Sequence, residues 1–212
     1  MARLILRNHH SLQCSQACVN CWLDPPRPFV VASCLKLTRK GSHMPEHFTD
    51  AQIADFLRRS YFVVDGLWFV KIEERRGFEE AMALDEAVWD VMSKVQARKA
   101  RALLGIEGGS VEDLARAFQL KLAAEGHGFD IEVSAREAVL TVRLCPWYEI
   151  LKSSGRTGIA ELIADRICKR EFGGWAKEFG RTIEVAFEGR LCVESDQCET
   201  CRIVFRSLQE VL

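Results

Sequence analysis

The stretch GHGFDIEVSAREAVLTVRLCP, residues 126–146, decides the fold class, because the spacing of apolar residues changes within it. Upstream of Gly126, apolar residues recur every three or four positions, which is typical of helices. From Phe129 onward, apolar and polar residues alternate on both sides of SARE (134–137), which indicates two strands joined by a turn. Pro146 then ends the second strand and begins a short helix.

Three long helices are predicted before this stretch. The first spans about residues 50–76, because Thr49 and Gln52 form a capping box and Gly77 ends the pattern. The second starts in GFEEAMALDEAVW (77–89) and stops at Gly105, and the third lies between Ser110 as N-cap and Gly126. Inward-facing residues of the third helix are predicted to be Leu114, Phe118 and Leu122.

Apolar stripes are also predicted on the first two helices. Gly66 interrupts the first helix, and we expect it to mark the close approach of another backbone or a ligand. The stripe of the first helix comprises Ile53, Phe56, Leu57, Tyr61, Val64, Leu67 and Trp68, and that of the second comprises Met82, Val88, Val91, Met92 and Val95.

The chain after Pro146 completes an α+β pattern. TGIAELIADRICKREFGGWAKEFG (157–180) predicts one longer helix and a shorter one after the glycine pair. RTIEVAFEG (181–189) and CRIVFRSL (201–208) alternate again and predict a second pair of strands. We therefore expect an α+β fold with long N-terminal helices, a small antiparallel sheet and further helices packed on one face.

The N-terminal region has the features of a leader that does not belong to the fold. Gly41, Ser42, His43 and Met44 spell a common expression-vector scar, so residues 1–43 are predicted to be vector-derived or disordered. Residues 44–212 then form a single α+β domain, with a helical half (44–126) and a sheet and cysteine half (127–212). If the leader is native, Cys14, Cys18 and Cys21 have the C-x3-C-x2-C spacing of radical S-adenosylmethionine enzymes.

Composition limits the possible partners. The chain has 29 Lys and Arg against 30 Asp and Glu. Six of the basic residues precede position 44 with one acid, Asp24, so the remainder is acidic, which argues against nucleic-acid binding. No apolar run reaches the roughly 18 residues needed to span a membrane. We expect a cytoplasmic protein that binds a small molecule, and its apolar first helix suits a homodimer.

Five cysteines follow Met44, and an odd number in a reducing compartment favours metal or thiol chemistry over disulfides. CETC (198–201) has the C-x2-C spacing of half a zinc or iron-sulfur site. The leading hypothesis is a zinc ion or [4Fe-4S] cluster held by Cys145, Cys168, Cys198 and Cys201, with Cys192 as the alternate ligand. Inert buried thiols are the simpler alternative.

Two other functions remain open from the residues. Cys145 is also a candidate nucleophile at a helix N-terminus, assisted by Glu149 or His127, which would make the protein a hydrolase. A non-catalytic sensor is the third hypothesis. In each case the predicted ligand-binding residues are Trp68, Trp89, Trp147, Tyr148, Asp65 and Arg98, and Arg98 is expected to pair with Asp65 or Glu73 if either turns inward.

Several segments resemble a known family. DGLWF (65–69), EERRGFEEAMALDEAVW (73–89), QARKARALLG (96–105) and CPWYEILKSSGR (145–156) are similar to the domain-of-unknown-function family 6125. That resemblance implies a long helical start and a cysteine-bearing α+β second half. The second half is also similar to L-2-amino-thiazoline-4-carboxylic acid hydrolases, which would imply hydrolytic opening of a small sulfur-containing or cyclic amidine ring.

Overall fold

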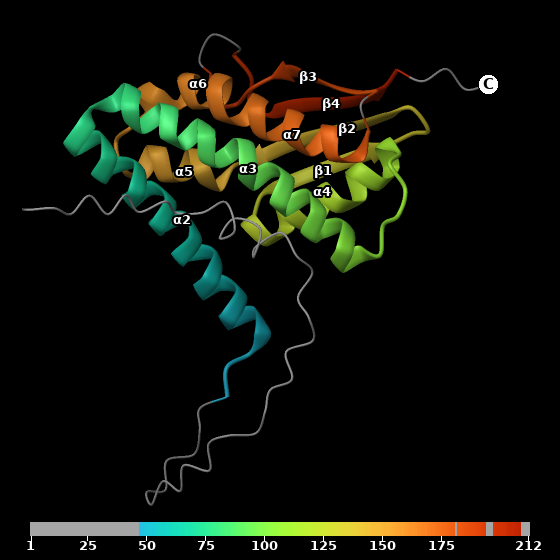
Figure 1. Cartoon of the computed structure of the whole chain (residues 1–212), viewed down its shortest axis with the longest axis horizontal. Coiled ribbons are helices and arrows are strands. Elements are labelled where there is room, and N and C mark those ends of the chain that lie inside the picture. Colours follow the sequence, from blue (N-terminus) through green and yellow to red (C-terminus); the bar gives the residue numbers. More distant parts are fainter. Residues whose placement is uncertain (1–46, 181, 194–196, 209–212) are drawn as a thin grey trace, which may run out of the picture. The chain divides into compact units, whose positions relative to one another are not determined.

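Two long antiparallel helices start the fold in the computed structural model, which describes residues 47–180, 182–193 and 197–208 (Figure 1). Helix α2 (Asp50–Arg76) begins with the predicted Thr49–Gln52 capping box, and α3 (Phe78–Leu104) follows directly. Gly77 joins them with a φ of 91°, a backbone angle that favours glycine. The predicted leader and its C-x3-C-x2-C motif lie outside the described residues.

Helix α4 (Val111–Glu125) closes the helical half as the sequence predicted. Ser110 and Asp113 form a reciprocal capping box, and Gly126 ends the helix in the left-handed region. Leu114, Phe118 and Leu122 are all buried. The N-cap, the C-cap and the inward face of this helix were therefore predicted correctly.

A four-stranded antiparallel sheet, in the order β1-β2-β4-β3, forms the second half. Its strands are β1 (Gly128–Val133), β2 (Glu137–Leu144), β3 (Ile183–Gly189) and β4 (Cys201–Ser207). Alternate residues such as Leu140, Ile203 and Phe205 pack into the core against α4 and α7 (Lys169–Phe179). The α+β prediction is confirmed.

The segment between β2 and β3 is helical but differs from the prediction. It comprises α5 (Pro146–Ser153), η1 (Thr157–Ile159), α6 (Ala160–Ile163), a π-helical turn η2 (Ala164–Cys168) and α7. Gly173 and Gly174 lie inside α7, so the predicted helix break is wrong. A Cβ on Gly174 would lie 2.2 Å from Ser93 Oγ of α3, so this glycine allows two helices to approach closely.

Aromatic side chains dominate the core. Phe118 is fully buried and contacts the rings of Phe172, Trp175 and Phe205, with centroids 4.8–5.6 Å apart. A second cluster, centred on Met82, Trp89 and Ile167, joins α3 to η2. The main core therefore lies between the sheet and helices α4 and α7.

The predicted apolar stripes of α2 and α3 are only partly correct. Most of the α2 stripe is exposed, while Phe62 and Phe69 face the body of the protein. In the α3 stripe, Met82 is buried and Met92 and Val95 are half-buried, but Val88 and Val91 are exposed. A Cβ on Gly66 would meet no atom within 4 Å, so no described backbone approaches it closely.

Among the described residues, no helix combines the length and apolar character needed to cross a membrane.

Candidate functional site

Three of the predicted metal ligands come to the same end of the sheet. Cys145 directly follows β2, and Cys201 opens β4, where it pairs in register with Val142. Cys192 lies in the connection between β3 and β4, close enough to Cys201 for their side chains to hydrogen bond. Cys168 ends η2 and packs against the same core as Cys145 and Cys201. We call Cys145, Cys168, Cys192 and Cys201 the thiol cluster.

Backbone amides lie near two of these sulfurs. The Leu191 N–H donates to Cys201 Sγ over 3.4 Å. The N–H groups of Trp147 and Tyr148, in the first turn of α5, lie near Cys145 and lower its pKa, but Cys145 makes no side-chain capping hydrogen bond. Pro146 occupies the first position of α5, where its fixed φ suits the start of a helix. An amide N–H interacts more strongly with a thiolate than with a thiol.

The thiols of Cys145, Cys168 and Cys201 are protonated near neutral pH. Burial raises the pKa of Cys145 to about 11, and the neighbouring Cys192 adds to the effect. Burial also raises the pKa of Cys168 well above its usual value, with Cys145, Glu171 and Cys192 contributing. The hydrogen bond to Cys192, followed by burial, raises that of Cys201. Within the described part of the chain, no three His, Cys, Asp or Glu side chains are arranged to hold a metal ion.

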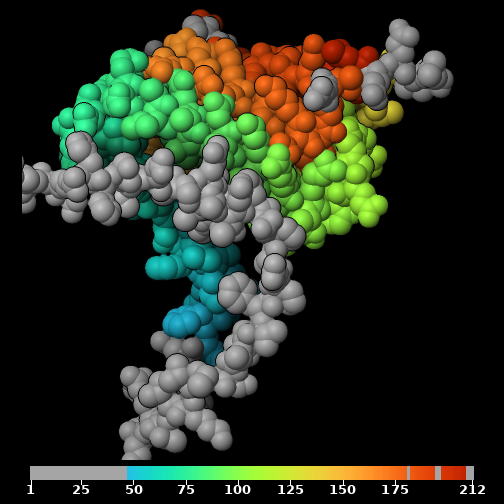
Figure 2. Space-filling view, viewed as in Figure 1, coloured from blue at the N-terminus to red at the C-terminus, as the bar shows by residue number. Residues whose placement is uncertain are grey.

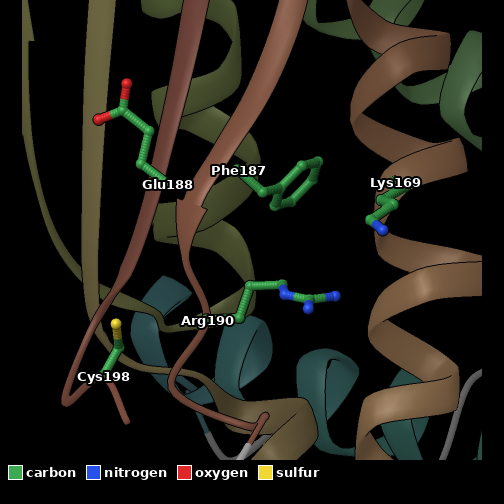
Figure 3. Close-up of a pocket in the computed structure, with 5 residues that line it drawn as sticks. All are labelled: Lys169, Phe187, Glu188, Arg190 and Cys198. Carbon is green, nitrogen blue, oxygen red and sulfur yellow. The ribbon is translucent and has the colours of Figure 1, made fainter. Parts of the chain in front are cut away.

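Cys198, a preferred ligand in the sequence-based hypothesis, lines a different feature. Its sulfur lies beside Gly189, at the rim of an open surface hollow of about 360 Å³. The other residues lining the hollow are Lys169, Phe187, Glu188 and Arg190 (Figure 3). Asp165 forms ion pairs with both Lys169 (2.5 Å) and Arg190 (2.6 Å), so the two cations beside the hollow already have an acidic partner.

A buried ion triad adjoins the thiol cluster. Lys121 Nζ of α4 lies 2.7 Å from Glu125 Oε2 and 2.9 Å from Glu171 Oε1, and all three side chains are at most 7% exposed. Burial opposes the charge of Lys121, but the two carboxylates outweigh it and raise the lysine pKa. Burial also raises the pKa of Glu171, although Lys121 counteracts this. Lys121 lowers the pKa of both Cys145 and Cys168, so the triad and the thiol cluster share one buried polar region.

Other buried polar atoms next to the triad have no hydrogen-bond partner. The buried polar atoms without a hydrogen-bond partner include Tyr61 Oη, His127 Nδ1 and Glu125 Oε1. His127 Nδ1 lies 3.6 Å from Glu125 Oε2, too far for a hydrogen bond. Burial, reinforced by Lys121, lowers the pKa of His127 to about 4, so its imidazole is neutral at pH 7. Buried polar groups without a hydrogen-bond partner are costly in a core, so these atoms lower the stability of this region.

Two carboxyl groups meet between α2 and α3. Burial raises the pKa of Asp65 to about 7, and the charge of Asp85 contributes. Burial raises that of Asp85 to about 6, although a hydrogen bond with Trp89 opposes it. The predicted pairing of Arg98 with Asp65 is wrong, because Arg98 forms a bidentate interaction with Glu178 (2.8 and 3.0 Å). The alternative Glu73–Arg98 pairing is also wrong, since Glu73 binds Arg156 (2.7 and 2.9 Å).

The predicted nucleophile lacks the partners that were named for it. Glu149 is half-exposed and forms an ion pair with Lys152 over 2.6 Å. His127 interacts with Lys121 and Glu125 of the triad region. Cys145 is partly buried, and the pKa of its thiol is raised rather than lowered. The arrangement therefore does not provide an activated thiolate.

The predicted aromatic ligand-binding residues are dispersed. Trp147 packs edge-on against Trp89 and Tyr61, with ring centroids 5.7 Å apart in both pairs. Tyr148 instead lies under the ammonium of Lys152 at 5.1 Å. Trp68 is 67% exposed on α2. Trp89 and Trp147 therefore belong to the second core cluster, which binds α5 to α3.

The sequence reasoning missed Lys121, Glu125 and Glu171. A signal for two of them was available, because Lys121 and Glu125 are one turn apart and follow Leu114 and Phe118 on the inward face of α4. A charged i,i+4 pair on a core-facing stripe predicts a buried ion pair. Glu171 had no such signal, since it comes from α7 and meets Lys121 only in the tertiary structure.

These features define a class of α+β proteins. A four-stranded antiparallel sheet packs with helices around a buried ion triad, and partly buried cysteines lie nearby. The chain belongs to a family of unknown function, DUF6125, whose model matches residues 49–200. The predicted resemblance to this family is confirmed. A comparison with curated proteins gave no match.

Proposed function

We propose that this protein binds zinc or an iron-sulfur cluster through Cys145, Cys168, Cys192 and Cys201. Four ligands from separate segments, gathered at one place by folding, are the usual arrangement of a structural or electron-carrying thiolate site. In this proposal Cys192 takes the place that the sequence-based hypothesis gave to Cys198. A cytoplasmic location, where thiols stay reduced, would keep these ligands available.

The amide donors are the observation that carries the proposal. The Leu191 N–H donates to Cys201 Sγ over 3.4 Å. The N–H groups of Trp147 and Tyr148 lower the pKa of Cys145. All three amides interact more strongly with a thiolate than with a thiol, so they favour the charged state that a metal ligand requires.

The charges near the thiol cluster act in both directions. The positive charge of Lys121 lowers the pKa of Cys145 and Cys168, which favours metal-binding thiolates. Glu125 and Glu171 already pair with Lys121, however, and Glu171 raises the pKa of Cys168. Because burial keeps these thiols protonated without a metal, metal binding must draw the sulfurs together and expel their protons.

The test is metal analysis of the full chain, purified without oxygen. We expect one zinc ion or one cluster per chain, identified by elemental analysis and the visible spectrum. Adding zinc to the metal-free protein in weak buffer should release more than two protons per ion. Serine variants of Cys145, Cys168, Cys192 or Cys201 should each lose most of the metal.

Two control variants make the result specific. Cys198→Ser changes a cysteine outside the thiol cluster and should keep its metal. A triple variant, in which Ser replaces Cys14, Cys18 and Cys21, should also keep it. Metal that disappears with the triple variant, or metal retained by all four cluster variants, would overturn the proposal. Hydrolysis of a thiazoline by metal-free protein, abolished in Cys145→Ser, would instead support the nucleophile hypothesis.

A further inference from the structure

Helix α2 is apolar on two opposite faces. One face carries Phe62 and Phe69, which pack toward α3 and α5. The opposite face carries a continuous outward stripe at helical spacing, whose members are each 47–70% exposed: Ile53, Phe56, Leu57, Val63, Val64, Leu67 and Trp68. The space-filling view shows the N-terminal half of α2, in cyan, projecting from the described helices and sheet (Figure 2).

The exposed apolar surface is large enough for a stable interface. Phe56 is 70% exposed and Trp68 is 67% exposed, and each ring presents most of its area to solvent. Together the seven side chains of the stripe expose on the order of 800 Å², which is about what each partner contributes to a standard protein–protein interface. Contiguous exposed apolar patches of this size mark interaction sites rather than ordinary surface.

We propose that the outward stripe of α2 is a homodimer interface, in which α2 packs antiparallel against α2 of a second copy. In an antiparallel pairing, the two-fold axis would cross the outward stripe at the level of residue 62 along the helix and set Phe56 against Trp68 of the partner subunit. It would also set Leu57 against Leu67 of the partner subunit. Ser60, the small residue within the stripe, would lie near the axis and let the two backbones approach.

The charges at the ends of α2 fit this antiparallel pairing. The first turn carries Asp50, and the last turn carries Arg75 and Arg76. Two antiparallel helices therefore bring the acidic end of each close to the basic end of the other, and their dipoles oppose. Between these ends, Lys71 and Glu74 neutralise each other within one chain, 2.8 Å apart. A parallel pairing would instead bring like charges together.

The test is the molar mass of the full chain by light scattering and sedimentation from about 1 μM to about 100 μM. We expect about twice 24.1 kDa for the wild type. Phe56→Glu and Trp68→Ala should shift the dissociation constant upward by at least about 100-fold. Leu103→Glu alters a side chain that is 77% exposed on α3, so that control should stay dimeric. Circular dichroism would verify that every variant is folded.

A charge exchange tests the antiparallel direction. Asp50→Arg alone, and Arg75→Asp with Arg76→Asp, should each weaken the dimer, and their combination should restore it. Since α2 is about 40 Å long, its two ends cannot interact within one chain. A monomeric wild type would overturn the proposal, including the case in which residues of the same chain cover the stripe. A dimer insensitive to Phe56→Glu would overturn it as well.

Discussion

Replacing Lys121 with Met should strongly destabilise the protein at alkaline pH. Met has a similar length but no charge, so Glu125 and Glu171 would remain buried beside each other without the ammonium that lies 2.7 and 2.9 Å from them. Removing one partner of a buried ion pair typically costs about 3–5 kcal/mol. We expect a loss in this range at pH 8, measured by urea unfolding followed by tryptophan fluorescence.

The loss should depend on pH with a definite sign. Burial and the charge of Glu125 raise the pKa of Glu171, and Lys121 opposes this, so its removal would raise the Glu171 pKa further above the unfolded value. The folded variant would then bind more protons than the unfolded chain, so its stability must fall as pH rises. The penalty should therefore shrink by about 1–2 kcal/mol between pH 8 and pH 5.

Two further variants make this test decisive. Adding Glu171→Gln to Lys121→Met removes one buried charge and should recover part of the lost stability. Lys152→Met breaks the half-exposed pair with Glu149 and should cost less than about 1 kcal/mol. A Lys121→Met penalty below about 1 kcal/mol at pH 8, or one that does not change with pH, would refute the buried-triad argument.

The remaining predictions concern packing and titration. Gly174→Ala should destabilise the protein by about 1–3 kcal/mol, because the added Cβ would overlap Ser93. The Cβ of Gly173→Ala would meet no atom within 4 Å, so this variant should be neutral or more stable by up to about 1 kcal/mol. Thermal denaturation of both variants checks this. Phe118→Ala should cost about 3–5 kcal/mol in urea unfolding, because it empties the centre of the aromatic core. Because the pKa of Asp65 is raised to about 7, its contribution to wild-type stability falls as pH rises from about 4 to 7. Asp65→Asn should therefore be more stable than the wild type at pH 8. The free energy of unfolding of this variant should also change less with pH.

Local sequence patterns specify the helices and strands and most of their ends. The Thr49–Gln52 and Ser110–Asp113 boxes and the glycines at 77, 105 and 126 act on the backbone of their immediate neighbours, so helix starts and stops were readable. Strand alternation fixed the two strand pairs for the same local reason. The glycine pair at 173 and 174 was wrongly predicted to break the helix. Position 174 needs a residue without a side chain because Ser93 of another helix lies against it.

Which residues from distant segments meet depends on tertiary packing. The α2 sequence is apolar on two faces, so its pattern could not tell which of them packs against α3. Glu171 and Lys121 are separated by 50 positions and come together because α7 packs on α4. Cys145 and Cys168 likewise pack against the same core, and η2 places Cys168 there. Local spacing governs hydrogen bonds along a helix or strand, whereas a buried charge or thiol acquires its neighbours, and hence its pKa, from chain segments that are distant in sequence.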